Sequence, residues 1–235
     1  MRNIAFLFAF IFLLGYNSIA KDNSSIQFYP IEHASFVIQS GDITIFVDPV
    51  GAVEKYTNFP TPQLILLTHA HGDHLNKELI ESVKKENTQI IGPAIVTQQL
   101  GYGKTMANGE KATVSNINIE SVAMYNASPE RLNFHPKGVG NGYVIELNGE
   151  RIYIAGDTED IPEMRKLKNI DHAFVCMNLP YTMTPEQAAS AVLEFKPKHV
   201  YPYHYRQQDG FSNIDKFKEL VSTEPTIKVE LLKWY

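Results

Sequence analysis

Residues 68–74, with the sequence Thr-His-Ala-His-Gly-Asp-His, hold the densest group of possible metal ligands in the chain. Three of the eight histidines and one carboxylate fall within six residues there, as His69, His71, Asp73 and His74. Side chains two residues apart in an extended chain point the same way, and the glycine after His71 permits a turn that brings the next two ligands round. Imidazole nitrogen and carboxylate oxygen are usual zinc ligands, so the segment predicts a centre for two adjacent metal ions. The alternative is a polar loop with chance histidines, and the density of ligands argues against it.

A strand before this segment and a helix after it are expected to position its side chains. The continuous apolar run of residues 64–67 is typical of a strand buried on both faces, and it leads directly into the histidines. Leu75, Leu79, Ile80 and Val83 then recur at helical spacing. The metal ligands therefore fall in the turn between a buried strand and a helix.

Alternation of strand and helix patterns along the rest of the chain predicts the fold class. Strand patterns cover residues 26–29, 35–39, 43–47, 90–91, 110–113, 117–124, 142–147, 151–155, 172–177, 199–203 and 229–234. Helix patterns cover residues 161–167, 185–195 and 214–221, and a long polar loop covers residues 126–142. Because helices must cover the sheet faces, we expect an α/β fold, a four-layer αββα sandwich of two mixed β-sheets flanked by helices, in a single domain over residues 21–235.

The first twenty residues have the pattern of a secretory signal. Arg2 is their only charge, the run 4–14 is wholly apolar, and small residues precede an expected cleavage after Ala20. The apolar run is shorter than the roughly 20 residues that a membrane-spanning helix needs, so we expect export to the periplasm or beyond, with no membrane span after cleavage. Loss of Arg2 would take the formal net charge from −5 to −6. An acidic protein is a poor candidate for nucleic-acid binding, and a small-molecule substrate is expected instead.

The histidine segment resembles the signature of the metallo-β-lactamase superfamily, HxHxDH. The resemblance extends over nearly the whole chain after residue 20, and the segments that carry it are His33-Ala34-Ser35, Asp48-Pro49, Gly156-Asp157-Thr158, Thr182-Met183-Thr184 and Tyr201-Pro202-Tyr203-His204-Tyr205. The first, second and fourth of these segments resemble the L-ascorbate-6-phosphate lactonase-like branch. The resemblance implies the metallo-β-lactamase fold and a metal-dependent hydrolase.

By this resemblance, Asp157 would bridge two metal ions and His204 would bind the second. One position departs from the family pattern, because the family generally supplies another histidine where this chain has Asn126. His135, nine residues later in the long loop, is the candidate substitute; otherwise it contacts substrate or lies on the surface. Catalytic zinc usually has three protein ligands, and the sequence leaves these roles of His135 equally open. Asp48 is expected either to orient a ligand imidazole or to serve as a turn carboxylate.

The expected reaction is hydrolysis of a small-molecule ester, lactone or phosphoester by a water that two metal ions activate. The ions are expected to be zinc, with manganese or iron as alternatives, and Asp73 is the catalytic candidate that orients the water and moves its proton. Lys137, Tyr181 and Arg206 are candidates for binding an anionic substrate. The alternatives are a phosphodiesterase of the nuclease or phospholipase kind and a non-catalytic module that binds metal or ligand.

Overall fold

A first mixed sheet is formed by the N-terminal half of the protein, in a computed structural model that describes residues 25–235. The leader expected at residues 1–20 lies outside this range. The sheet has the order β1-β2-β3-β4-β5-β6, antiparallel from β1 to β3 and parallel from β3 to β6. The bounds are β1 Gln27–Glu32, β2 Ser35–Ser40, β3 Ile43–Val47, β4 Leu64–Leu66, β5 Gln89–Gly92 and β6 Lys104–Thr105.

The second mixed sheet has the order β15-β12-β11-β10-β9-β8-β7. It is antiparallel from β7 to β10 and parallel from β10 to β15. Its strands are β7 Lys111–Val114, β8 Ile117–Met124, β9 Gly140–Leu147, β10 Glu150–Ile154, β11 His172–Cys176, β12 His199–Tyr203 and β15 Lys228–Val229. A separate short hairpin pairs β13 Arg206–Gln207 with β14 Gly210–Phe211.

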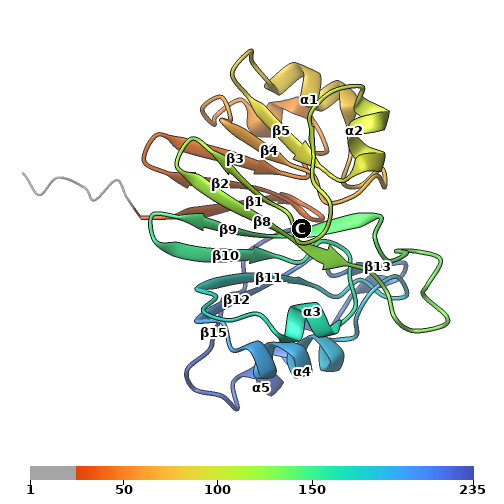
Figure 1. Cartoon of the computed structure of the whole chain (residues 1–235). Helices are drawn as coiled ribbons and strands as arrows, with labels where there is room; N and C mark the ends of the chain where they lie inside the picture. Colours follow the sequence, from red (N-terminus) through yellow and green to blue (C-terminus); the bar gives the residue numbers. More distant parts are fainter. Residues whose placement is uncertain (1–24) are drawn as a thin grey trace, which may run out of the picture.

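Helices cover the outer faces of both sheets, which gives the expected four layers. α1 Lys77–Val83 and α2 Ala94–Leu100 lie outside the first sheet, and α3 Pro162–Arg165, α4 Pro185–Phe195 and α5 Ile214–Val221 lie outside the second (Figure 1). A 3₁₀ turn, η1 Val53–Tyr56, follows β3. No helix among residues 25–235 has the length and apolar character needed to cross a membrane.

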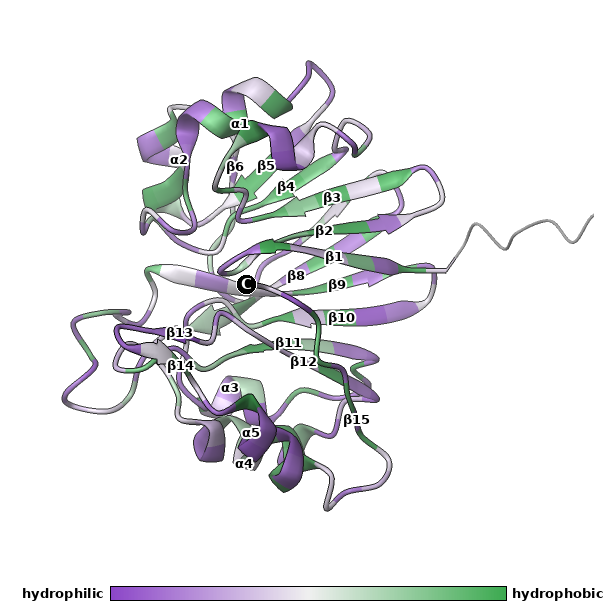
Figure 2. Ribbon diagram, turned by 180° about the vertical axis from the view of Figure 1, so that it is seen from behind, coloured by the Kyte–Doolittle hydropathy of each residue, from purple (hydrophilic) through white to green (hydrophobic). Residues whose placement is uncertain are grey.

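Because side chains alternate in direction along the strands of the first sheet, its two faces pack against different elements. Val37, Phe46 and Ile65 pack outward in a cluster with residues of α1 and α2, whereas Phe36 and Ile45 face the second sheet. Successive side chains of a strand point to opposite faces, so a strand buried on both faces reads as a continuous apolar run. Figure 2 shows the hydrophobic colour along β3 and β4 in the middle of the molecule.

Two expectations about element bounds need correction. The strand expected at residues 229–234 is limited to Lys228–Val229, and the chain continues without regular structure while Trp234 is buried against Phe36 and Tyr203. The apolar pattern there reflects burial rather than strand pairing. The expected loop 126–142 is shorter, because β9 begins at Gly140. The capping box of α4 is confirmed, since Thr184 accepts from the Gln187 N–H and the Gln187 side chain accepts from the Thr184 N–H.

Candidate metal centre

The carboxyl ends of six strands meet at one edge of the sandwich, and the candidate ligands lie there. β3 and β4 run parallel in the first sheet, and β8 has the same direction as β10, β11 and β12 in the second, because two antiparallel steps separate β8 from β10. The histidine segment follows β4, Asp157 follows β10 and His204 follows β12. The loop of residues 126–139 projects from the same edge, as does the β13–β14 hairpin (Figure 1).

His69, His71 and His135 form the first group of candidate ligands. One ring nitrogen from each lies within 4.8 Å of the other two. Nε2 of His69 is 3.0 Å from Nδ1 of His71, and the ring of His135 lies 5.3 Å from that of His69, centre to centre. The long loop therefore supplies the third histidine of this group. In the family pattern that histidine would stand at the position of Asn126.

Asn126 instead supports His135. Its side-chain NH₂ donates to the carbonyls of Arg131 and Tyr181, at 2.9 and 2.7 Å, and lies 3.2 Å from Nδ1 of His135. Nε2 of His135, in contrast, makes no hydrogen bond within residues 25–235. The contact with Asn126 therefore involves Nδ1 and leaves Nε2 as the ring nitrogen available to a metal ion.

Glu159 holds the start of the same loop. Its carboxylate, 2% exposed, accepts from the backbone N–H groups of Ala127 and Ser128 at 2.7 and 2.6 Å, and from Arg131 at 2.6 Å. The Asn126 N–H also donates to the backbone carbonyl of His135 at 2.8 Å, which closes the loop on itself. Charge-assisted bonds of this kind are among the stronger ones in proteins, so the position of His135 is well fixed.

Asp73, His74 and His204 form the second group of ligands, again with one ligand atom each within 4.8 Å of the others. Nε2 of His204 lies 3.4 Å from Oδ2 of Asp73. His74 and His204 are buried, whereas the Asp73 side chain is 45% exposed and faces the open side of the centre. His204 has a φ of 44°, a left-handed conformation that is uncommon for a residue with a side chain and is often found at functional sites.

Asp157 lies between the two groups. Its Oδ1 is 3.5 Å from Nε2 of His74, and its Oδ2 is 3.5 Å from Nε2 of His135 and 3.4 Å from Nε2 of His204. Gly156 makes this position possible, because its φ is +65° and a Cβ there would lie 2.5 Å from the sulfur of Met124. One buried carboxylate thus reaches histidines of both groups, which is the arrangement that a bridging ligand needs.

The polar atoms around this point fit a bound cation. Nε2 of His74, Nε2 of His135 and Oδ1 of Asp157 are buried and make no hydrogen bond within the described part of the chain. Each unpaired buried polar atom costs roughly 1–3 kcal/mol. Three such atoms directed at one place are explained if metal ions satisfy them, and the imidazole and carboxylate donor set suits zinc and similar divalent ions.

Asp48 orients the imidazole of His74 by a hydrogen bond to its Nδ1. Its Oδ2 accepts from Nδ1 of His74 at 2.8 Å, and its two oxygens also accept from the N–H and hydroxyl of Thr68 at 2.7 and 2.6 Å. The contact to Nδ1 leaves Nε2 of His74 for the metal ion. Of the two roles considered for Asp48 from the sequence, the geometry matches the orientation of a ligand imidazole.

Asn178 and Thr182 hold the other side of the centre. The Asn178 side-chain NH₂ lies 3.3 Å from Oδ2 of Asp157 and 3.2 Å from Nε2 of His204. Thr182 donates to the Asn178 side-chain oxygen and accepts from the Asn178 N–H, so the amide cannot turn over. Sequence reasoning missed the roles of Asn178 and Glu159. The available signal was a polar residue shortly after a strand that ends at the same edge as the ligands.

Electrostatics in the centre keep the carboxylates ionised. Burial alone would raise the pKa of Asp157, but His204 and His74 outweigh burial and hold it well below its usual value. Burial lowers the pKa of His69 well below its usual value, so this imidazole is neutral, as a metal ligand must be. Burial would also lower the pKa of His204, but Asp157 and Asp73 raise it to about 10.

The three residues considered for substrate binding do not gather with the ligands. The Lys137 ammonium bonds to Glu163 and to the Tyr125 hydroxyl and stands 4.4 Å from the centre of the Tyr125 ring. The Tyr181 ring packs edge-on against Phe134, and Arg206 lies exposed on β13. Their role in substrate binding stays a prediction.

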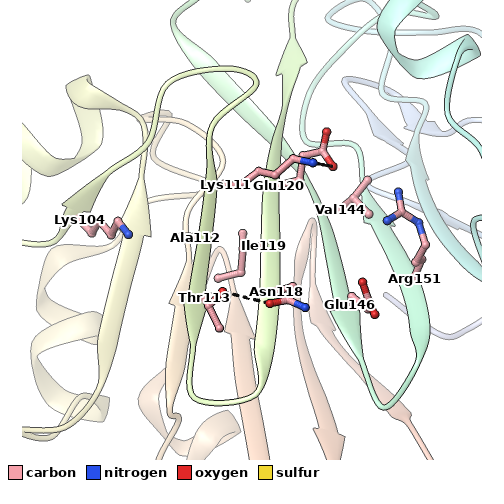
Figure 3. A pocket seen from close by; sticks show the side chains of 10 residues that line it. All are labelled: Lys104, Lys111, Ala112, Thr113, Asn118, Ile119, Glu120, Val144, Glu146 and Arg151. Atoms are coloured by element: carbon pink, nitrogen blue, oxygen red, sulfur yellow. Dashed lines mark hydrogen bonds and ion pairs between the residues drawn. The ribbon is translucent and has the colours of Figure 1, made fainter.

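A surface hollow of about 560 Å³ lies on the outer face of β7–β10, and none of the candidate ligands lines it. Figure 3 shows that most of its charged side chains come from neighbouring strands of the second sheet, while Lys104 comes from β6 of the first. Lys111 pairs with Glu120 at 3.5 Å. Glu146 and Arg151 are opposite each other in the β9–β10 ladder. Opposite charges on facing strands are ordinary for a solvated sheet face, so we place the functional site at the histidine cluster instead.

Comparisons with known proteins find similar proteins over most of the chain. Residues 26–204 match the family described as the β-lactamase superfamily domain. A metal-dependent hydrolase of Thermococcus onnurineus is 32% identical over 219 residues, which cover 83% of this chain and 92% of the relative. The crystal structure of a putative metal-dependent hydrolase from Parabacteroides distasonis has 42% sequence identity and a TM-score of 0.81, over 88% of this chain and 92% of that chain. A metallo hydrolase of Ignicoccus hospitalis, with 23% identity and a TM-score of 0.74, shares the fold.

Proposed function

This chain belongs to the metallo-β-lactamase superfamily and is a metal-dependent hydrolase, and we propose that it uses two metal ions to hydrolyse a small ester, lactone or phosphoester. The observation that carries the proposal is the position of Asp157 between two groups of ligands. A single-metal site would need only one group of three ligands, whereas the first and second groups supply three each and share no residue. His69, His74 and Asp157 form a further group that overlaps both. Two ions bound there would polarise the scissile carbonyl or phosphoryl group and lower the pKa of a shared water.

Asp73 is the residue that we assign to proton transfer. Its carboxylate is the exposed one in the centre, and His204 holds its Oδ2 at 3.4 Å. Its pKa lies below the usual value, because the hydrogen bond from His204 and the charge of His74 outweigh the effect of burial. Asp73 is therefore ionised at neutral pH, and it can orient an attacking water and take its proton.

The substrate class follows from what the molecule presents to it. The net charge of −5 opposes a long polyanion such as nucleic acid, so a small substrate is favoured over the phosphodiesters of nucleases. Relatives that are themselves named metal-dependent hydrolases support hydrolysis over a non-catalytic module. The L-ascorbate-6-phosphate lactonase-like branch, zinc as the bound metal and export by residues 1–20 remain parts of the proposal.

A substrate panel tests this proposal. The purified full chain, loaded with zinc or manganese, is assayed on p-nitrophenyl esters, on lactones, and on p-nitrophenyl phosphate and bis-p-nitrophenyl phosphate. We expect turnover of an ester, lactone or phosphomonoester that a chelator abolishes and added metal restores. Asp73→Asn should lower kcat by about 10²–10⁴-fold, the usual contribution of a general base, while Asp42→Asn in an exposed turn serves as the matched control. Turnover confined to the phosphodiester would establish the phosphodiesterase alternative.

A further inference from the structure

We infer that an apolar cup beside the first group of histidines binds an apolar group of the substrate, next to the bond that is hydrolysed. This inference rests on the proposed function and names the chemistry of one part of its substrate. We use "apolar cup" for the cavity of about 170 Å³ whose lining includes His69, His71 and His135 together with Ile95, Phe134 and Val139.

Exposed apolar side chains gather in this cup from separate parts of the chain. Ile95 comes from α2, and Phe134 and Val139 come from the loop that carries His135. They are 38%, 36% and 38% exposed, and they are three of nine large apolar side chains with such exposure among residues 25–235. A single exposed apolar residue needs no explanation. Three that line one cavity together with metal-ligand candidates have the character of a ligand pocket.

The cup excludes charged groups by its composition. Its other lining residues are Ala70, Met124, Asn133, Pro136 and Gly140, so no lysine, arginine, aspartate or glutamate contributes to the wall. A charged substituent placed against Ile95, Phe134 and Val139 would lose hydration without gaining an ionic partner from these side chains. The apolar cup therefore selects a neutral, apolar group, whatever charge the rest of the substrate carries.

The volume of the apolar cup limits the size of the substrate group that it can hold. A water molecule occupies about 30 Å³ of the liquid, so 170 Å³ holds roughly five or six non-hydrogen atoms. A chain of four to six carbons or a phenyl ring meets this limit. Because the three histidines of the first group also line the apolar cup, a substrate group bound there lies beside the reacting bond.

The walls are held in place before any ligand arrives. Phe134 packs edge-on against Tyr181 with ring centres 5.0 Å apart, and the bond between Arg131 and Glu159 fixes the loop just before it. Preformed pockets bind without the cost of ordering loops on association. Tyr181, which the sequence suggested as a substrate contact, acts in this account by supporting Phe134.

Binding of hydroxamates to the metal-loaded full chain tests the inference without requiring turnover. Hydroxamates chelate metal ions through a constant head group, so acetohydroxamate, hexanohydroxamate and decanohydroxamate differ only in their alkyl chain. Each fully buried methylene strengthens binding by about fourfold. For a partly open cup we expect the Kd, by calorimetry, to fall at least about tenfold from acetohydroxamate to hexanohydroxamate. A much smaller further fall is expected for decanohydroxamate.

Ile95 gives the sharpest variants, since it lies on a helix away from the ligands in sequence. Ile95→Trp fills the cup and should bring the ratio of the two Kd values close to one, with acetohydroxamate binding changed less than about twofold. Val53→Ala, an exposed apolar position on η1, should keep the parent ratio. Equal affinities in the parent, or the parent ratio in Ile95→Trp, would overturn the inference. A preserved ratio in a chain that hydrolyses no substrate would contradict only the proposed function.

Discussion

At the residue scale, two imidazoles of the centre are held through Nδ1, the ring nitrogen that does not face Asp157. Asp48 accepts from Nδ1 of His74, and the Asn126 amide lies 3.2 Å from Nδ1 of His135. Both contacts leave an unpartnered Nε2 directed toward Asp157. The chemistry of the centre therefore depends on residues that touch no metal ion themselves.

Replacement of Asp48 tests this dependence. Asp48→Asn keeps the shape but replaces a carboxylate oxygen with an amide that accepts less strongly, so His74 loses its fixed tautomer. Outer contacts of this kind typically change metal affinity by about 10–100-fold. We expect such a loss in a competition titration with a chromogenic chelator, and no loss in Asp42→Asn. An affinity equal to that of the parent would show that Asp48 only closes a turn.

The sequence specified part of the site and could not specify the rest, for a physical reason. Ligands close together in the chain, such as His69 and His71, are brought together by local geometry alone. His135 comes from a loop whose path depends on Glu159, Arg131 and Asn126, and these contacts form only in the folded chain. The choice between Asn126 and His135 therefore needed the structure.

At the scale of elements, the parallel strands β10, β11 and β12 place Asp157 and His204 side by side, and Asp171 fixes their opposite ends. Its carboxylate accepts from the Arg151 N–H at 2.8 Å and pairs with Lys198 at 2.7 Å. Its backbone also joins Arg151 and His199. One residue thus links the starts of three neighbouring strands, and the ends of two of them carry ligands.

Asp171 gives a prediction about pH. Burial would raise its pKa, but Lys198 and the Arg151 N–H outweigh burial and hold the pKa below the usual value of 3.8. A lowered folded-state pKa gives stability that is present above pH 3.8 and is lost as the pH falls further. We expect Asp171→Asn to lower the free energy of unfolding by about 1 kcal/mol at pH 7, a value limited by the exposure of Lys198.

Urea unfolding at several pH values measures this difference. The gap between parent and Asp171→Asn should narrow as the pH falls below 3.8. Asp42→Asn supplies the matched control. A gap that stays constant down to the lowest pH at which the chain folds would show that the effect of the substitution does not come from ionisation.

Strand bounds were predictable where an apolar run is both buried and paired with other strands. They were not predictable where an apolar run is buried without such pairing. The runs that became β3, β4, β11 and β12 have partners on both sides in their sheets. The final segment has a similar apolar content, but only Lys228–Val229 pairs, and Trp234 is buried by packing. An apolar pattern reports burial, and burial can be reached without a sheet partner.

At the scale of the whole molecule, the two sheets must stay packed for the ligand groups to share Asp157, because each sheet supplies part of the centre. Phe36 of β2 and Phe174 of β11 stack across the interface with ring centres 4.3 Å apart, and both are fully buried. Packing between the sheets therefore sets the distance between the ligand groups.

Truncation of Phe36 tests this packing. Phe36→Ala should lower the free energy of unfolding by about 3–5 kcal/mol, through lost burial and the cavity that remains. Phe211→Ala removes a 55% exposed ring and should change it by less than about 0.5 kcal/mol. Chemical denaturation followed by circular dichroism compares the two. Equal effects would mean that the Phe36–Phe174 contact does not hold the sheets together.

The central claim is that two metal ions are bound and that His135 is a ligand of one. Mass spectrometry of the metal content per chain tests it most directly, on the purified parent, His135→Ala and the control His199→Ala, whose histidine lies stacked on His172 outside the centre. The account predicts close to two ions in the parent and in His199→Ala, and close to one in His135→Ala. Two ions retained in His135→Ala, or none in the parent under metal-replete conditions, would contradict it.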